Sequence, residues 1–160
     1  MLKNTGIITP EELENVMPPR ARLEKGPVAI IECLQDLPCD PCVSACPVNA
    51  IQMKAGITDK PQLVFDTCTG CGACVPKCPG LAIFIVNMKH APGLATLSLS
   101  YELLPVPAKG DEVEALDRSG TAICRAKVVR VINTPAYDRT AVVTIEIPAD
   151  RINEIRAIRV

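Results

Sequence analysis

The sequence predicts an α+β fold: a small, internally duplicated unit, then a small antiparallel β-barrel and a C-terminal helix. Three observations lead to this prediction. Eight of the nine cysteines lie between residues 33 and 78. The segment that holds them contains two similar halves, offset by 32 residues. Beyond about residue 92, segments rich in Val and Ile alternate with turns. We therefore divide the chain into an N-terminal arm (1–26), the duplicated unit (27–90) and a docking domain (91–160).

Each half of the duplicated unit is expected to form a strand, a cysteine loop, a short helical turn and a second strand. The segments 28–33 and 63–68 each run directly into a cysteine, and the segments 46–53 and 78–85 each begin with Cys-Pro. The turn-rich segment 54–61 joins the halves. Because each half is too small to form a core alone, the two should bury their apolar faces against each other.

The arm carries a helix-start signal: Thr9 as N-cap, Pro10 in the first turn and Glu12 closing a capping box. Pro18 and Pro19 end this helix early. Two interpretations stay open for the arm. Either it lies against a partner, or it is a frayed terminus with one helical turn.

The docking domain combines strand patterns with a helical pattern at its end. Strands are expected in the segments 94–101, 109–116, 121–132 and 139–147. The last segment, 148–159, begins with Pro148 and places Ile152, Ile155 and Ile158 on one helical face. These elements predict the small barrel and the C-terminal helix.

Composition restricts the function classes. Aromatic residues make up 2% of the chain, so a compact fold needs aliphatic packing, a cross-link or a metal. Nine cysteines cannot all form disulfides, and the N-terminus has no apolar export signal, which favours a cytoplasmic protein with metal-binding thiols. No apolar run is long enough for a membrane span. With a net charge of −1 and neither half basic, a nucleic-acid binder is disfavoured.

The run CTGCGACVPKCP, residues 68–79, has the spacing C-x2-C-x2-C-x3-C-P. This pattern is typical of bacterial 4Fe–4S clusters, in which four thiolates surround a compact core. Gly70 and Gly72 allow backbone turns that bring N–H groups towards sulfur. A structural zinc site is the alternative, but its cysteine pairs are usually separated by a longer loop.

With these motifs, residues 27–90 resemble a bacterial-type two-cluster ferredoxin. The resemblance implies a pseudo-twofold fold that transfers single electrons through two 4Fe–4S clusters. In such proteins the fourth cysteine of each run binds the other cluster. The resemblance therefore implies one cluster on Cys46, Cys68, Cys71 and Cys74, and three corners of the other on Cys39, Cys42 and Cys78.

The remaining corner of the first cluster is ambiguous, because Asp36 stands at the regular position. Cys33 is one candidate, with residues 34–38 as an insertion. Asp36 is a second, since carboxylates are workable iron ligands. The third possibility is a 3Fe–4S cluster without a fourth ligand. We favour Cys33, because thiolate is the preferred ligand of a cubane iron and because each half then has a cysteine directly after its first strand.

No phosphate-binding loop, nucleophile–base pair or flavin motif is present, which indicates electron transfer rather than catalysis. The whole chain resembles the ferredoxin-like subunits of flavin-dependent amino-acid or amine dehydrogenases, including hydroxyproline- and proline-type enzymes. That resemblance implies a flavoprotein partner in a hetero-oligomer. The alternatives are a free shuttle ferredoxin, a nucleic-acid-binding barrel with structural clusters, and an iron–sulfur enzyme with an open iron site. We interpret Cys124 as a buried structural thiol, and His90 supports no assignment.

Overall fold

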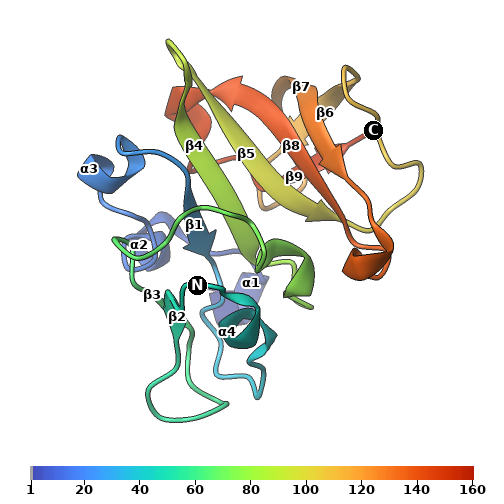
Figure 1. The fold of residues 1–160 in the computed structure, drawn as a ribbon. Helices are drawn as coiled ribbons and strands as arrows, with labels where there is room; N and C mark the ends of the chain where they lie inside the picture. Colours follow the sequence, from blue (N-terminus) through green and yellow to red (C-terminus); the bar gives the residue numbers. More distant parts are fainter. Residues whose placement is uncertain (1) are drawn as a thin grey trace.

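The structure of the chain, a computed structural model, describes residues 2–160. It contains an antiparallel sheet with a cysteine-bearing lobe at one end (Figure 1). Among the described residues the sheet has seven strands in the order β1-β4-β5-β8-β7-β6-β9, and β2 and β3 form a separate pair. The helical elements are α1 (Leu2–Thr5), α2 (Pro10–Leu13), α3 (Arg20–Leu23), α4 (Pro41–Ala45), η1 (Val75–Lys77), η2 (Pro135–Tyr137) and η3 (Ala149–Arg151). The strands are β1 (Val28–Ile31), β2 (Ile51–Gln52), β3 (Gln62–Leu63), β4 (Ile83–Ala91), β5 (Leu94–Tyr101), β6 (Glu112–Leu116), β7 (Ala122–Ile132), β8 (Ala141–Pro148) and β9 (Ala157–Arg159).

The two halves of the cysteine unit interlock. The first half supplies β1, α4 and β2, and the second supplies β3, η1 and β4. β1 pairs antiparallel with β4, and β2 pairs antiparallel with β3. Each of these two strand pairs therefore contains one strand from each half. Asn49 and Leu81, which are equivalent positions, have nearly equal left-handed φ values of 53° and 51°. The internal repeat seen in the sequence is thus also a repeat of backbone conformation.

The predicted barrel is wrong, because the seven-stranded sheet is open. Its edges are β1 and β9, which do not pair with each other in the structure of residues 2–160. Along β5, half-buried and buried residues alternate, as in a sheet with one covered face. Such alternation is the same in a closed barrel and in an open sheet, so the sequence pattern did not separate the two.

The predicted C-terminal helix is also wrong. After β8 the chain forms the short helix η3 and a further turn at residues 152–154, and then β9 pairs antiparallel with β6. Ile152, Ile155 and Ile158 are all buried, as the apolar spacing requires, but turns and a strand bury them instead of a helix. Pairing with β9 satisfies backbone groups of β6 that would otherwise be unpaired at the edge of the sheet, and this outweighs a weak helical preference.

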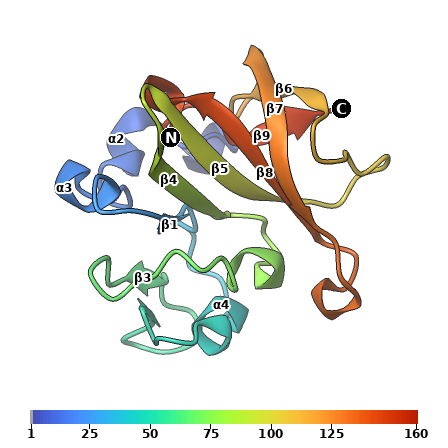
Figure 2. The same cartoon turned by 45° about the horizontal axis from the view of Figure 1, so that its top comes forward.

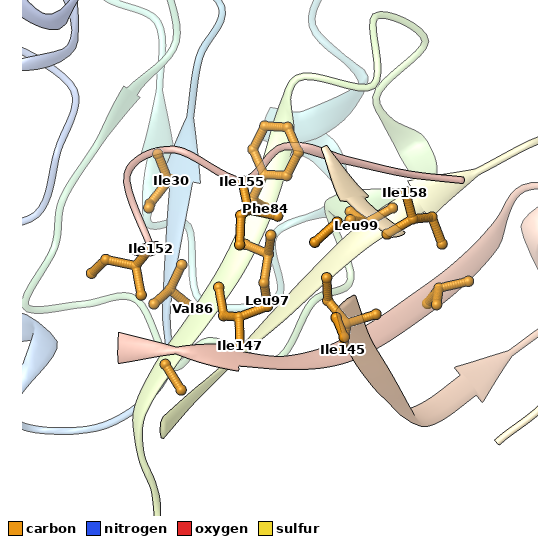
Figure 3. Close-up of a cluster of buried hydrophobic side chains, with 14 of the residues drawn as sticks. Ile30, Phe84, Val86, Leu97, Leu99, Ile145, Ile147, Ile152, Ile155 and Ile158 are labelled. Atoms are coloured by element: carbon orange, nitrogen blue, oxygen red, sulfur yellow. The ribbon is translucent and has the colours of Figure 1, made fainter. Parts of the chain in front are cut away.

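One apolar core joins the cysteine unit to the sheet (Figure 3). It combines Ile30 and Phe84 of the duplicated unit with Leu97 and Ile145 of the central strands and Ile155 of the C-terminal segment. β4 begins in the cysteine unit and continues as an inner strand of the sheet, as Figure 2 shows. The sheet therefore fixes the position of the strands that carry the cysteine loops.

The N-terminal arm folds back onto its own chain. The capping box of α2 is present: the Thr9 side chain accepts a hydrogen bond from the N–H of Glu12, and the Thr9 N–H donates to Glu12 Oε2 at 2.9 Å. Leu13, Arg22 and Leu23 are buried. The arm is thereby placed beside the loop that carries Cys68, which Arg22 contacts.

Candidate iron–sulfur site

Cys33, Cys39, Cys42 and Cys78 come together beside the end of β1; we call them group 1. Cys42 lies in α4, and burial raises the pKa of its thiol to about 11, with the neighbouring thiols of Cys78, Cys33 and Cys39 adding to the increase. Burial also raises the pKa of Cys33, and the proximity of Cys78 and Cys39 contributes. Cys33 therefore shares the electrostatic environment of the three cysteines that follow the regular spacing.

Asp36 lies in a different environment. Its side chain is 76% exposed, and its carboxylate forms an ion pair with the ammonium of Lys60, at 3.5 Å. Hence Asp36 is exposed and paired with a lysine, whereas Cys33 lies near the thiols of Cys78 and Cys39.

Cys46, Cys68, Cys71 and Cys74 form the second cluster of thiols, which we call group 2. Burial raises the pKa of Cys74 to about 12, and the thiols of Cys68, Cys71 and Cys46 add to the increase. All four line one cavity, which is walled by apolar side chains such as those of Ile51 and Ile85. Buried thiols of this kind lose their protons when they bind a metal, since ligation requires the thiolate.

Backbone amides point at several of these sulfurs. The N–H of Ala50 donates to Cys46 Sγ at 3.2 Å, and at the equivalent position the N–H of Ala82 donates to Cys78 Sγ at 3.4 Å. Cys68 Sγ accepts from two amides, those of Ala29 and Gly70, at 3.5 and 3.4 Å. Such hydrogen bonds stabilise ligating thiolates and help to set a cluster's reduction potential.

The glycine at position 70 is required by the geometry of this loop. Gly70 has φ +66°, and a Cβ atom there would lie 2.5 Å from the backbone carbon of Pro27. Its turn directs its own N–H to Cys68 Sγ, as the sequence predicted. Gly72 is also left-handed, with φ +81°.

Arg22 is a site residue that sequence reasoning missed. Its buried guanidinium donates to the carbonyl oxygens of Phe65 (2.8 Å), Gly26 (3.2 Å), Pro27 (3.0 Å) and Cys68 (2.6 Å). It thereby ties α3 to the loop that carries Cys68. The contact to Cys68 spans 46 residues, and no local pattern in the sequence indicates it.

Cys124 and His90 lie away from the thiol groups. Cys124 on β7 is half-buried rather than buried, and it packs against the main core. His90 Nε2 lies 2.6 Å from Glu146 Oε2 at the far end of β4.

The sizes of the two groups match the ligand number of a 4Fe–4S cluster, which is held by four thiolates. No three His, Cys, Asp or Glu side chains among residues 2–160 are arranged to hold a single metal ion. In a cubane, each thiolate binds a different iron, so the four sulfurs do not converge on one point. Groups 1 and 2 each supply the four thiols that one such cluster needs. Within the same described residues, no helix has the length and apolar character required to cross a membrane.

Comparison with known proteins agrees with this chemistry. The 4Fe–4S dicluster domain family matches residues 37–82. The ferredoxin-type protein NapF of Haemophilus influenzae is 43% identical over 59 residues, which are 36% of this chain and 34% of NapF. The uncharacterized ferredoxin MJ0155 of Methanocaldococcus jannaschii is 47% identical over 47 residues, which are 29% of each chain. The chain thus spans about a third of the length of these curated relatives.

No solved structure matches the chain. Residues 37–82 are thus similar to a 4Fe–4S dicluster domain, and the relatives that this part of the chain matches are named as ferredoxin-type proteins. The family match begins after Cys33, so it does not bear on the irregular ligand.

Proposed function

We propose that group 1 (Cys33, Cys39, Cys42 and Cys78) holds one 4Fe–4S cluster and group 2 (Cys46, Cys68, Cys71 and Cys74) holds the other. The observation that carries this proposal is the exchange of one cysteine between halves. Cys46 belongs to the first cysteine run but lies with group 2, and Cys78 belongs to the second run but lies with group 1. This exchange would bring the two clusters close together, because each cysteine run supplies ligands to both clusters.

The clusters, when bound, each take up and release one electron. Around them, this chain excludes water with the apolar walls of the group 2 cavity and donates amide hydrogen bonds to Cys46, Cys68 and Cys78. Cys71 is exposed, so group 2 reaches the protein surface, where a redox partner can approach. Two neighbouring one-electron carriers suit a flavin, which collects two electrons as a hydride and releases them singly.

We therefore assign the chain as the electron-transfer subunit of a cytoplasmic, heteromeric flavin-dependent dehydrogenase. The proposed substrate class, amino acids or amines of the hydroxyproline or proline type, rests on the resemblance of the whole chain to such subunits. The five strands β5 to β9, which residues 94–159 add to the sheet, support the subunit assignment, because a free shuttle needs only the cysteine unit. A docking domain gives these additional residues a role.

The assignment is tested by gentle anaerobic purification of the tagged full chain from its native cells. Co-purification of a flavoprotein in a fixed ratio, with the visible spectra of both flavin and iron–sulfur clusters, is the expected result. A brown chain that elutes alone and free of flavin would refute the subunit assignment and favour the free shuttle ferredoxin. The net charge of −1 does not favour that alternative, since electrostatically docking shuttles are strongly acidic.

A further inference from the structure

A buried ion cluster lies directly beside Cys33. The carboxylate of Glu32 accepts two hydrogen bonds from Arg118, at 2.6 and 2.9 Å, and one from Arg156 Nε, at 2.6 Å. The side chains of Glu32 and Arg156 are 5% and 3% exposed. We call Glu32, Arg118 and Arg156 the Glu32 triad. Both arginines come from the C-terminal sheet region, 86 and 124 residues away in the sequence.

The backbone of Glu32 also connects the triad to group 1. Its N–H donates to the carbonyl of Ala82 at 2.8 Å, and the N–H of Ala82 donates to Cys78 Sγ at 3.4 Å. Glu32 therefore contacts the turn after Cys78 and directly precedes Cys33. Cys33 and the two arginines line the same groove.

Stability alone does not explain the triad. Removing a carboxylate and two guanidinium groups from water is unfavourable, and such buried pairs often stabilise a fold no more than apolar residues do. Arg156 Nη2 is in addition buried without a hydrogen-bond partner among the described residues. A buried charge cluster in which one donor has no hydrogen-bond partner calls for an explanation other than stability. We infer that these side chains hold a neighbouring segment of the chain in a fixed position.

The need for such a fixed position follows from the irregular spacing of Cys33. Five residues, 34–38, separate it from Cys39, where the regular pattern has two. This longer connection restrains Cys33 less than a C-x2-C turn does. Asp36 and Leu37 of the connection are exposed. The chain must therefore hold Cys33 from its other side, where Glu32 lies.

We propose that the Glu32 triad positions Cys33 as the fourth ligand of the first cluster, so that the C-terminal sheet completes a ligand set that the cysteine motif leaves open. This inference rests on the proposed ligation by Cys33. It makes Glu32, Arg118 and Arg156 positioning residues, and it gives the C-terminal region a role within the chain in addition to docking.

The test uses the full chain, purified anaerobically with its clusters. Glu32→Gln keeps the size of the side chain but removes its charge, and Arg118→Gln alters a less buried member of the triad, 14% exposed. Glu114→Gln is the matched control, because Glu114 also accepts from a C-terminal arginine, Arg159, at 3.0 Å but lies on the exposed face of β6. Cys33→Ala provides the reference for a missing fourth ligand.

We expect both triad variants to lose one iron per chain, from about eight to about seven, and to show the EPR signal of an oxidised 3Fe–4S cluster. The second cluster should remain intact and serves as an internal reference. The control should retain both clusters. If circular dichroism shows that Glu32→Gln does not fold, the iron content and EPR spectrum of Arg118→Gln test the proposal.

Three results would overturn the proposal, and they are distinguishable. If the folded triad variants keep both 4Fe–4S clusters while Cys33→Ala loses the first, the triad does not position Cys33. If they lose both clusters in parallel, the triad only supports the fold. If Cys33→Ala itself keeps an intact first cluster, the ligand assignment under the proposed function fails, and the inference fails with it.

Discussion

The contacts of Arg22 allow one prediction to be worked out quantitatively. Arg22→Met removes four hydrogen bonds from a guanidinium to backbone carbonyls, at 2.6 to 3.2 Å. A hydrogen bond to a charged group contributes about 1.5–3 kcal/mol, so simple addition gives about 6–12 kcal/mol. Bonds that share one side chain are not additive, and some of the carbonyls can regain water, so we expect a loss of about 3–5 kcal/mol.

The assay is an anaerobic thermal melt followed both by circular dichroism and by the visible absorbance of the clusters. For a chain of this size, the predicted loss lowers the Tm by about 6–20 °C. Cluster absorbance should decrease at a lower temperature than in the wild type, because Arg22 binds the carbonyl of Cys68, a member of group 2.

The matched control is Arg20→Met in the same helix. The Arg20 side chain is 82% exposed and forms only a surface ion pair with Glu24, which is typically worth about 0.3–0.5 kcal/mol. Its Tm should change by about 1–2 °C. A Tm for Arg22→Met equal to that of Arg20→Met would refute the reasoning that Arg22 fastens the cysteine loop.

Three further predictions concern the ligands and the arm. Gly70→Ala should prevent assembly of the second cluster, because its Cβ would meet backbone at 2.5 Å, whereas Gly80→Ala, with nothing within 4 Å, should assemble normally; iron content compares the two, and equal contents would contradict the steric argument. Asp36→Ala should leave both clusters unchanged in EPR, while Cys33→Ala yields the 3Fe–4S signal; the opposite pattern would identify Asp36 as the ligand. Thr9→Ala should destabilise the chain by about 1 kcal/mol through loss of the capping box, measured by denaturant titration, and an unchanged midpoint would show that the arm unfolds independently of the rest.

The cysteine chemistry was the most predictable part of the molecule. The spacing of residues 68–79, together with the family resemblance, predicted how the thiols would divide into groups 1 and 2. In the structure the thiols within each set lie close enough to raise one another's pKa, and that each set binds a cluster stays a prediction. Short motifs of this kind are predictable because ligand geometry is set locally, by the number of residues between thiols and by turns such as that of Gly70.

The architecture of the C-terminal region was only partly predictable. Its strands were expected from their Val- and Ile-rich alternation, but alternation does not say which strands pair at the edges of a sheet. The segment 148–159 has apolar residues three apart, which suits a helix. The end of this segment forms the strand β9 instead, because it pairs with β6, which lies far away in the sequence.

The buried arginines were missed for a related reason. Arg22 acts on a loop more than 40 residues away, and Arg156 acts on Glu32 from the opposite end of the chain. In the sequence each looks like an ordinary surface charge, because an arginine's burial depends on partners that only the fold brings near. The proposed role of the C-terminal region in positioning Cys33 could therefore not be inferred from the sequence.

The central claim, two adjacent clusters built on groups 1 and 2, is tested most directly by a reductive titration of the anaerobically purified chain, with EPR recorded at each step. We predict uptake of about two electrons per chain, one for each 4Fe–4S cluster, and a final spectrum broadened by magnetic interaction between two neighbouring reduced clusters. Uptake of a single electron, or two signals that show no interaction, would contradict the claim.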